Sequence, residues 1–418
     1  MNQKRVILLI IDGCGIGAAP DFAQYNDTAD CNTLANVAKV VQGLNLPNLY
    51  KFGLGNICNL QGLPVNPQPL GVNAKLEELS SAKDTQTGHW EMMGLVSEVG
   101  FPLYPQGFPP DVIQEFIKQT GCQNVLVNLP YSGTKVLDDY GDEHCKSGFP
   151  IVYTSGDSVF QIACHTDVIP IETQYKWCEI ARAILTGKHN VGRVIARPFN
   201  GVSGRYQRIS ALRHDYTVLP PRKTLLDELI VNNLGVLGIG KIEDIFCKQG
   251  LSHAIHTGSN LEGLKLTMEA MQNQLDLNKL RLSKETPENI NFIFTNLVDT
   301  DSLYGHRRDA QGYYKALKEI DNYLGNIQSI MTKDDLVIIS SDHGNDPTAT
   351  GTDHTREYVP FLMFNSQMPQ YEANLGALKG FSQIGLAIEY WLKLDNTSLH
   401  AFKEELDPRI VEYLHQVA

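Results

Sequence analysis

The residues best suited to chemistry follow a short apolar run in the C-terminal third of the chain. Leu336–Ser341 is typical of a buried strand; Asp342 and His343 follow directly, and His354 comes twelve residues after Asp342. Carboxylate and imidazole together suit divalent zinc, manganese or iron, and the absence of cysteine here argues against a purely structural zinc site. A strand-end aspartate can also be a turn former or helix cap, so this segment alone leaves both interpretations open.

Two other apolar runs end in the same way. Arg5–Ile11 is followed by Asp12, and Asn291–Val298 is followed by Asp301 and then His306. Runs that are apolar throughout indicate strands covered on both faces, as in a parallel sheet, whose carboxyl ends meet at one edge. We therefore expect the polar side chains of the three segments to lie close together.

These strand ends supply three carboxylates and three imidazoles, enough for two metal ions with three protein ligands each. The carboxylates are Asp12, Asp301 and Asp342, and the imidazoles are His306, His343 and His354. Two metal ions about 4 Å apart stabilise the attacking and leaving oxygens in phosphoryl transfer. The joint pattern therefore favours a metal site that binds an anionic nucleophile or a phosphate.

A polar loop with two threonines runs into a predicted helix in the segment Ser80–Gly94. Hydroxyls and backbone amides at a helix start can hold a phosphate, and a threonine bound to a metal could act as a nucleophile. Thr85 and Thr87 are the candidates, and an ordinary threonine cap is the alternative for either.

The elements that must position these residues alternate between strands and helices. Further strands are predicted near 124–127, 151–154, 235–241 and 359–364, and helices at 33–41, 111–119, 173–185, 225–231, 261–275, 311–331 and 383–394. This alternation predicts an α/β fold with a mostly parallel sheet flanked by helices.

A smaller inserted domain is expected between two proline-rich segments. The prolines at 102–110 and at 220–221 delimit residues 102–221 as an α+β insert, leaving 1–101 and 222–418 as the core. Within the insert and its end, Arg193–Lys223 holds seven Lys/Arg and one acid, Asp215. Arginine forks match phosphate oxygens, so an anionic ligand is predicted, with a solvated basic face as the alternative. Lys241 is a weak further candidate.

Composition indicates a folded globular protein. The 418 residues are 42% hydrophobic and 20% charged, and the net charge of −12 argues against general nucleic-acid binding. The eight cysteines are scattered, as in a reducing compartment. Val6–Ile11 is too short for a signal-peptide core and no run approaches a membrane span, so a cytoplasmic protein without a membrane partner is expected.

Several motifs together resemble the phosphopentomutases of the alkaline phosphatase superfamily. They are Asp12-Gly, the segments 83–91, 192–198 and 301–308, and the segments 342–346 and 352–357. The resemblance spans nearly the whole chain, and it implies an alkaline-phosphatase-like core with an inserted cap at 102–221. It also implies interconversion of ribose or deoxyribose 1-phosphate and 5-phosphate, two Mn²⁺ ions, a ribose 1,5- or glucose 1,6-bisphosphate activator, and a monomer.

The resemblance also assigns roles to single residues. Asp12, Asp342 and His343 would hold one manganese, and Asp301, His306 and His354 the other. Thr85 would be the phosphorylated nucleophile. The sugar phosphate would contact Asp157, Arg193, Arg208 and Lys241.

Three departures from the family pattern accompany the resemblance. Gly156 replaces a more usual alanine, Asn32 stands where aspartate is common, and the segment from Arg208 to Arg213 is one residue longer. Two enzyme alternatives are a metal-dependent phosphatase and a cofactor-independent phosphoglycerate mutase, which would be expected to use serine. A metal-binding scaffold without catalysis is a third, which the intact Thr85 beside Lys83 and His89 argues against.

Overall fold

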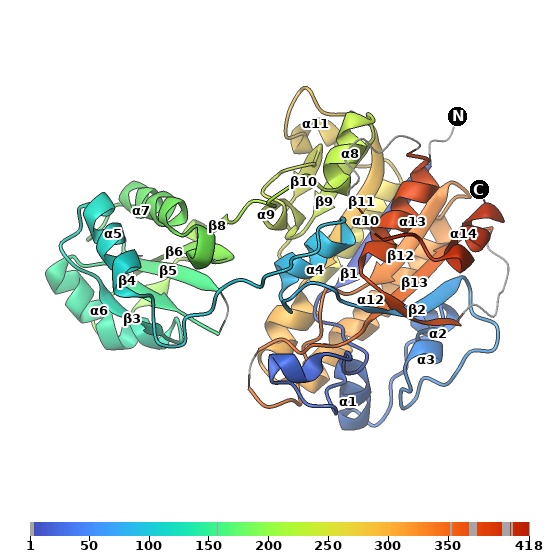
Figure 1. Cartoon of the computed structure of the whole chain (residues 1–418), viewed down its shortest axis with the longest axis horizontal. Helices are drawn as coiled ribbons and strands as arrows, with labels where there is room; N and C mark the ends of the chain where they lie inside the picture. Colours follow the sequence, from blue (N-terminus) through green and yellow to red (C-terminus); the bar gives the residue numbers. More distant parts are fainter. Residues whose placement is uncertain are drawn as a thin grey trace. The chain divides into compact units, whose positions relative to one another are not determined.

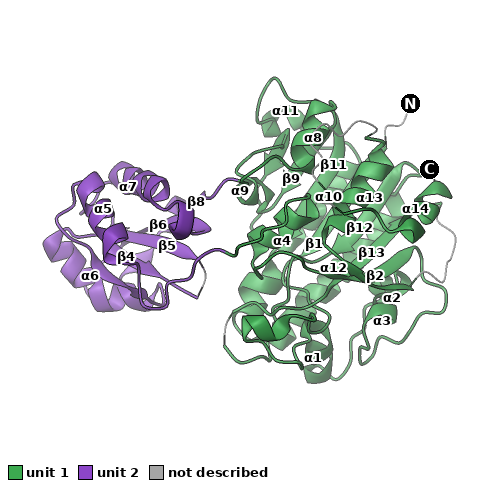
Figure 2. Cartoon of the chain, viewed as in Figure 1, with its two compact units in different colours: residues 1–100, 220–418 green, residues 101–219 purple. Residues whose placement is uncertain are grey.

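A computed structural model describes residues 4–156, 158–351, 353–367, 374–394, 402 and 404–417. The chain divides into two compact units, residues 1–100 with 220–418, and residues 101–219 (Figure 2). The second unit covers nearly the range that the proline-rich segments set apart, and its role as a cap stays a prediction. Among the described residues, no helix combines the length and apolar character that crossing a bilayer requires.

The first unit is built on an eight-stranded sheet in the order β10-β9-β11-β1-β12-β13-β2-β14. The strands are β1 (Arg5–Ile11), β2 (Val72–Glu77), β9 (Gly235–Ile239), β10 (His253–Ile255), β11 (Ile290–Leu297), β12 (Asp335–Ser340), β13 (Val359–Asn365) and β14 (Asn374–Lys379). β1 pairs in parallel with both β11 and β12, although these come from the distant C-terminal part (Figure 1). β9 and β10 continue the parallel part, whereas β13 is antiparallel to β12 and β2. The expected mostly parallel α/β fold is confirmed, and β1, β11 and β12 end at one edge.

Helices cover both faces of this sheet. The helical elements of the first unit are η1 (Phe22–Tyr25), α1 (Thr33–Val40), α2 (Pro47–Lys51), α3 (Leu54–Ile57), α4 (Thr85–Met92), α8 (Leu225–Val231), α9 (Ile242–Ile245), α10 (Asn260–Met271), α11 (Leu277–Leu280), η4 (Thr300–Gly305), α12 (Ala310–Ile330), α13 (Ser382–Leu392) and α14 (Pro408–His415). On β11, Thr295 bonds Thr267 of α10 at 2.7 Å, whereas Phe294 stacks on His89 of α4. Since successive side chains of a strand point to opposite faces, α10 and α4 lie on opposite sides.

Local sequence explains where the helices begin and end. α12 starts where the Asp309 carboxylate accepts a hydrogen bond from the Gly312 amide, and it buries an apolar stripe that includes Leu317 and Leu324. The predicted helix 311–331 is thereby confirmed. The helix predicted over 261–275 ends earlier, at Met271, because the chain turns at Asn273, whose φ is +56°.

The second unit has a six-stranded sheet in the order β3-β4-β5-β6-β7, with β8 paired to β6. Its elements are β3 (Leu126–Pro130), β4 (Ile151–Thr154), β5 (Val159–His165), β6 (Arg193–Asn200), β7 (Gln207–Arg208), β8 (His214–Thr217), α5 (Pro110–Thr120), α6 (Lys135–Ser147), α7 (Ile171–Ile184), η2 (Gly187–His189) and η3 (Ser210–Leu212). One apolar cluster joins α5 and α7 to the sheet, and a second joins α6 to its other face. The strand predicted near 124–127 begins later, at Leu126, after the turn that follows α5.

An acidic pair in the first unit predicts a pH-dependent stability. Burial, together with buried Glu228, raises the pKa of Glu389 from 4.5 to about 7. The folded chain thus holds this proton more tightly than the unfolded chain, so stability should fall as pH rises from about 4.5 through 7. Glu389→Gln should raise the melting temperature at pH 8 and change it little at pH 4.5, measured by thermal unfolding. A variant that loses stability at pH 8 would contradict this.

Candidate active site

The ends of β1 and β12 bring three of the predicted ligands together. The Nε2 atom of His343 lies 3.5 Å from Asp12 Oδ1 and 3.5 Å from Asp342 Oδ2. The other Asp342 oxygen, Oδ1, accepts a hydrogen bond from the Gly13 amide at 3.1 Å, which fixes the carboxylate. Asp12, Asp342 and His343 thus form one group of convergent ligand atoms.

A π-helical turn after β11 places Asp301 beside His306. In η4 the His306 amide donates to the Asp301 carbonyl at 3.1 Å, a bond between residues five apart. Such a turn returns the chain to the same side after five residues, so both side chains face the site. His306 Nε2 lies 3.5 Å from Asp301 Oδ2.

An antiparallel bridge brings His354 back to this edge. The backbones of Gly344 and Thr355 exchange two hydrogen bonds, and His354 therefore stacks on His343 with ring centroids 3.7 Å apart. His354 Nε2 lies 3.3 Å from Asp301 Oδ1 and 3.1 Å from His306 Nε2. Asp301, His306 and His354 form the second group.

The donor set fits divalent metal ions. Asp12 Oδ1 and Asp342 Oδ2 are buried and have no hydrogen-bond partner among the described residues. His354 Nδ1 lies 2.8 Å from the Lys83 carbonyl and His343 Nδ1 lies 3.1 Å from the Gly344 carbonyl. Because a carbonyl only accepts, each Nδ1 carries the proton and each Nε2 is the unprotonated nitrogen, which can ligate a metal.

Burial and mutual charge perturb these groups. Burial raises the pKa of Asp12 well above its ordinary value, and Asp342 and Asp301 raise it further. Burial also acts to raise the pKa of Asp342, but His343 and His89 outweigh it and lower the pKa to about 2. Burial lowers the pKa of His343 to about 4, so its ring is neutral at pH 7. Cations would relieve the repulsion among these carboxylates.

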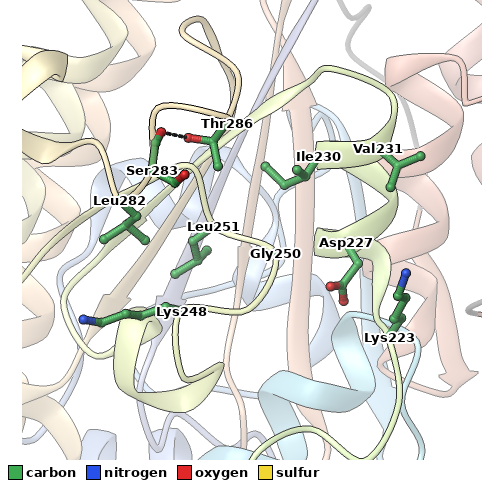
Figure 3. Close-up of a pocket in the computed structure, with 10 residues that line it drawn as sticks. All are labelled: Lys223, Asp227, Ile230, Val231, Lys248, Gly250, Leu251, Leu282, Ser283 and Thr286. Carbon is green, nitrogen blue, oxygen red and sulfur yellow. Dashed lines mark hydrogen bonds between the residues drawn. The ribbon is translucent and has the colours of Figure 1, made fainter.

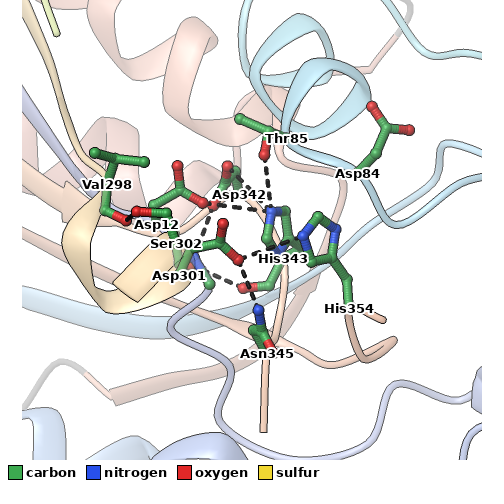
Figure 4. Close-up of polar contacts among 12 residues, drawn as sticks. Asp12, Asp84, Thr85, Val298, Asp301, Ser302, Asp342, His343, Asn345 and His354 are labelled. Carbon is green, nitrogen blue, oxygen red and sulfur yellow. Dashed lines mark hydrogen bonds and ion pairs between the residues drawn. The ribbon is translucent and has the colours of Figure 1, made fainter. Parts of the chain in front are cut away.

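Thr85 opens helix α4 and points at this cluster. Its hydroxyl lies 3.1 Å from His343 Nε2 (Figure 4). The preceding Asp84 caps the helix, accepting hydrogen bonds from the amides of Gln86 and Thr87. The Thr87 hydroxyl instead donates to the Asp84 carboxylate at 2.9 Å. The Thr87 hydroxyl therefore serves the helix cap, whereas the half-buried Thr85 hydroxyl faces the ligand cluster.

Gly88 lets helix α4 approach the end of β12. A Cβ atom at this position would collide with the backbone oxygen of Asp342. Gly88→Ala should push Thr85 away from the ligand cluster, lowering turnover by roughly 10²-fold, the cost of a misplacement of about 1 Å. Steady-state kinetics would test this, with the exposed Gly258→Ala as control. An unchanged turnover number in Gly88→Ala would show that the close approach is not required.

Three supporting side chains were not predicted as site residues. Asn296 donates to Asp12 at 3.0 Å, and Asn345 donates to Asp301 at 2.7 Å. The buried ring of His89 lies with Nδ1 2.8 Å from the Thr85 carbonyl and 3.3 Å from Asp342 Oδ2. Asn345 and His89 occur in the motifs at 342–346 and 83–91, but no spacing rule identifies Asn296.

The predicted substrate contacts are divided between the units. Lys241 joins the metal-ligand cluster, with Nζ 3.8 Å from Asp12 Oδ2. Arg193 and Arg208 belong to the second unit, where Arg193 lies 3.6 Å from Asp215 and Arg208 donates to the Gly133 carbonyl at 2.9 Å. Asp157 lies outside the described residues.

A separate cavity of about 400 Å³ lies beside α8 (Figure 3). Lys223, Asp227, Leu251 and Thr286 are among the residues that line it. None of the predicted site residues contributes to this lining, and Asp227 is engaged in capping α8. The cavity is therefore distinct from the cluster around Thr85.

Comparisons with known proteins show which family the chain belongs to. The profile of the metalloenzyme superfamily matches residues 4–395. A protein named phosphopentomutase from Dictyoglomus turgidum is 47% identical over 94% of this chain and 95% of its own. One of the same name from Alkaliphilus metalliredigens is 48% identical over 94% of this chain and 96% of its own. A solved protein of Pyrococcus horikoshii is 12% identical, covers 95% of this chain and 99% of its own, and has a TM-score of 0.48, too low to carry weight.

The family match and the two groups of convergent ligands indicate a metal-dependent enzyme. With relatives at this identity over nearly the full length, the chain belongs to the phosphopentomutase family within the metalloenzyme superfamily.

Proposed function

We propose that the chain is a phosphomutase that interconverts ribose or 2-deoxyribose 1-phosphate and the 5-phosphate through a phosphorylated Thr85. The observation that carries this proposal is the Thr85 hydroxyl, 3.1 Å from His343 Nε2 at the start of a helix. The positive end of a helix favours a phosphate, so both the free and the phosphorylated threonine suit this position.

Asp12, Asp342 and His343 would hold one cation, and Asp301, His306 and His354 the other. Mixed oxygen and imidazole ligands suit manganese, which we propose as the metal. When bound, the two cations would neutralise the phosphate oxygens and stabilise attacking and leaving oxygens. Asn296 and Asn345 would orient the carboxylates of Asp12 and Asp301.

The reaction uses the phosphothreonine twice. The 1-hydroxyl of ribose 5-phosphate attacks the phosphorus, the bond to Thr85 Oγ1 breaks, the proton of the sugar hydroxyl passes to Thr85 Oγ1, and a 1,5-bisphosphate forms. After the sugar reorients, Thr85 Oγ1 attacks the 5-phosphate and the 5-hydroxyl leaves with a proton, giving ribose 1-phosphate. Thr85 is thereby phosphorylated again, so the step balances without water. A ribose 1,5- or glucose 1,6-bisphosphate would supply the first phosphoryl group.

Most of the proposed substrate contacts are cationic side chains. Lys241 lies beside the ligand cluster, and its ammonium would attract the phosphate. Arg193 and Arg208 are the proposed contacts from the second unit, together with Asp157. This unit is the proposed cap, which would keep water from the phosphothreonine.

We also propose that the protein acts as a cytoplasmic monomer without a nucleic-acid partner. All eight cysteines are free thiols, which suits a reducing compartment, and the net charge of −12 disfavours nucleic acid. Light scattering of the purified protein tests the monomer, since a mass of twice 46.5 kDa would refute it.

The test is to incubate the manganese-loaded protein with ribose 5-phosphate and a trace of glucose 1,6-bisphosphate. We expect ribose 1-phosphate to form, Thr85 to carry a phosphate by mass spectrometry, and a chelator to stop turnover. Release of free phosphate alone would favour a metal-dependent phosphatase. Absence of turnover would favour a metal-binding scaffold.

A further inference from the structure

The segment that leads to Thr85 is a loop without a helix or strand of its own. It spans residues 78–84, between the end of β2 at Glu77 and the start of α4 at Thr85. Loops hold a catalytic group less precisely than helices and strands do, and a misplacement of about 1 Å can cost roughly 10²-fold in rate. The side chains that hold loop 78–84 therefore bear on where the Thr85 hydroxyl lies.

Arg356 holds the carbonyl groups of this loop. The residue is 1% exposed, and its Nη2 and Nη1 donate to the carbonyls of Glu78 at 2.7 Å and Ala82 at 2.5 Å. Nη1 also donates to the Glu78 carboxylate. Nε and Nη2 donate to the Asp21 carboxylate at 3.1 and 2.9 Å. All five N–H groups of the guanidinium thus have an acceptor, and two of these acceptors are carbonyls four residues apart in the loop.

Arg356 and His354 reach the loop from the same side of one extended segment. Thr355 between them forms an antiparallel bridge, and side chains two residues apart in an extended backbone point the same way. The His354 Nδ1 donates to the Lys83 carbonyl at 2.8 Å, one residue after the carbonyl that Arg356 binds. The segment therefore connects loop 78–84 directly to a proposed metal ligand.

Glu91 holds the amide groups of the same loop. This buried residue of α4 accepts hydrogen bonds from the amides of Leu79 at 2.9 Å and Ser80 at 2.6 Å. It also accepts from the Ser80 hydroxyl at 2.6 Å and from the Phe381 amide at 2.8 Å. Because Glu91 and Thr85 belong to one helix, these bonds tie the loop to the element that carries the nucleophile.

This buried polar network is better suited to fixing a geometry than to adding stability. The attraction between a buried guanidinium and a carboxylate is largely offset by the cost of removing both from water. In addition, Glu78 Oε1 is buried without a hydrogen-bond partner among the described residues. A network that binds backbone groups in fixed directions does specify one conformation of the loop.

We propose that Arg356 and Glu91 are positioning residues, which hold loop 78–84 from two sides so that the Thr85 hydroxyl faces the ligand cluster. Neither belongs to the two groups of convergent ligands, so both would act through the loop. The inference rests on the proposed function, since it requires Thr85 to be the nucleophile. Both residues occur in the motifs at 352–357 and 83–91, yet the sequence assigned neither of them a role.

Glu91→Gln is the milder test, because glutamine keeps the shape but has only one oxygen to accept the loop amides. We expect kcat to fall about tenfold or more, with the KM for ribose 5-phosphate within about twofold of the parent's, since the reacting groups are misplaced and no substrate contact is lost. The rate at which glucose 1,6-bisphosphate phosphorylates Thr85, followed by mass spectrometry, should fall by the same factor.

Asp321→Asn is the matched control for Glu91→Gln. Asp321 is also buried, and its carboxylate accepts from the amides of Asn48 at 3.0 Å and Leu49 at 2.7 Å, at the start of α2. This variant should lower the melting temperature and leave kcat unchanged when both are measured well below the melting temperature.

Arg356→Lys keeps the positive charge but cannot bind both ends of the loop, because lysine lacks the planar fork. We expect kcat to fall roughly 100-fold with the KM nearly unchanged. Arg5→Lys is its control, since Arg5 pairs with buried Asp335 at 2.8 Å at the opposite end of β1 and should not affect kcat. If Arg356→Lys fails to fold, Glu91→Gln still decides.

Measurements on the parent enzyme separate this inference from the proposed function. A parent that forms neither ribose 1-phosphate nor phosphothreonine refutes the proposed function and the positioning roles together. With an active parent, an unchanged kcat in Glu91→Gln overturns the positioning roles alone. A raised KM without a fall in kcat also overturns them, and so does a fall in kcat that Asp321→Asn shares at an equal loss of melting temperature.

Discussion

Thr85→Ala is expected to abolish mutase activity, by roughly 10⁴-fold or more, because the variant lacks the hydroxyl that faces His343 at the start of helix α4. Thr85 belongs to neither group of three ligands, so the variant should still bind two manganese ions. Ribose 1-phosphate formation and metal binding by calorimetry measure the two effects separately. Mass spectrometry should find no phosphate on residue 85.

Thr87→Ala is the matched control from the same helical turn. Its hydroxyl donates to Asp84, so the change should cost about 1 kcal/mol of stability and leave the phosphorylation of Thr85 intact. The mechanism would be refuted if the Thr87→Ala variant lost its phosphate and the Thr85→Ala variant kept it. Thr87 would then be the nucleophile.

Asp12→Asn should lower the activity but raise the stability of the metal-free protein. Asp12 is fully buried beside Asp342 and Asp301, and one of its oxygens has no hydrogen-bond partner among the described residues. Losing this ligand should reduce turnover by about 10³-fold or more, since a bound metal contributes several kcal/mol to transition-state stabilisation. Without metal, the variant should be more stable than the parent by about 2 kcal/mol, because one of three crowded carboxylates is gone.

Chemical denaturation of the parent and of Asp12→Asn, each with chelator and with manganese, measures their free energies of unfolding. Manganese should stabilise the parent more than the variant. In the chelated proteins the gain should shrink as the pH falls, since the raised pKa of Asp12 favours the protonated carboxyl. A metal-free variant less stable than the metal-free parent would mean that Asp12 has a structural role.

The long apolar runs made the central sheet predictable. β1, β11 and β12 are buried on both faces, so their hydrophobicity is continuous and their boundaries fall within one or two residues of expectation. β2 was not predicted, because polar Asn73 and Lys75 interrupt a short segment whose strand state depends on pairing with β13.

The residues of the ligand cluster could be predicted because an aspartate follows each of three apolar strands. Their geometry could not be predicted from the sequence. Asp301 reaches His306 through a π-helical turn, which no residue pattern identifies. Asn296 donates to Asp12 from within strand β11, where a polar residue gives no indication of a site role. The close approach at Gly88 likewise depends on the backbone oxygen of Asp342, about 250 residues further along the chain.

The insertion has a consequence for synthesis on the ribosome. The Leu225 amide donates to the Met93 carbonyl at 3.0 Å, so the chain resumes the first unit next to where it left. Residues 101–219 are contiguous, so the second unit can fold as soon as it has been synthesised. Strand β1 cannot pair until β11 and β12 have been synthesised. Strand β1 is therefore made first and stays unpaired until β11 emerges, and during this interval the nascent polypeptide depends on chaperones that shield exposed strands.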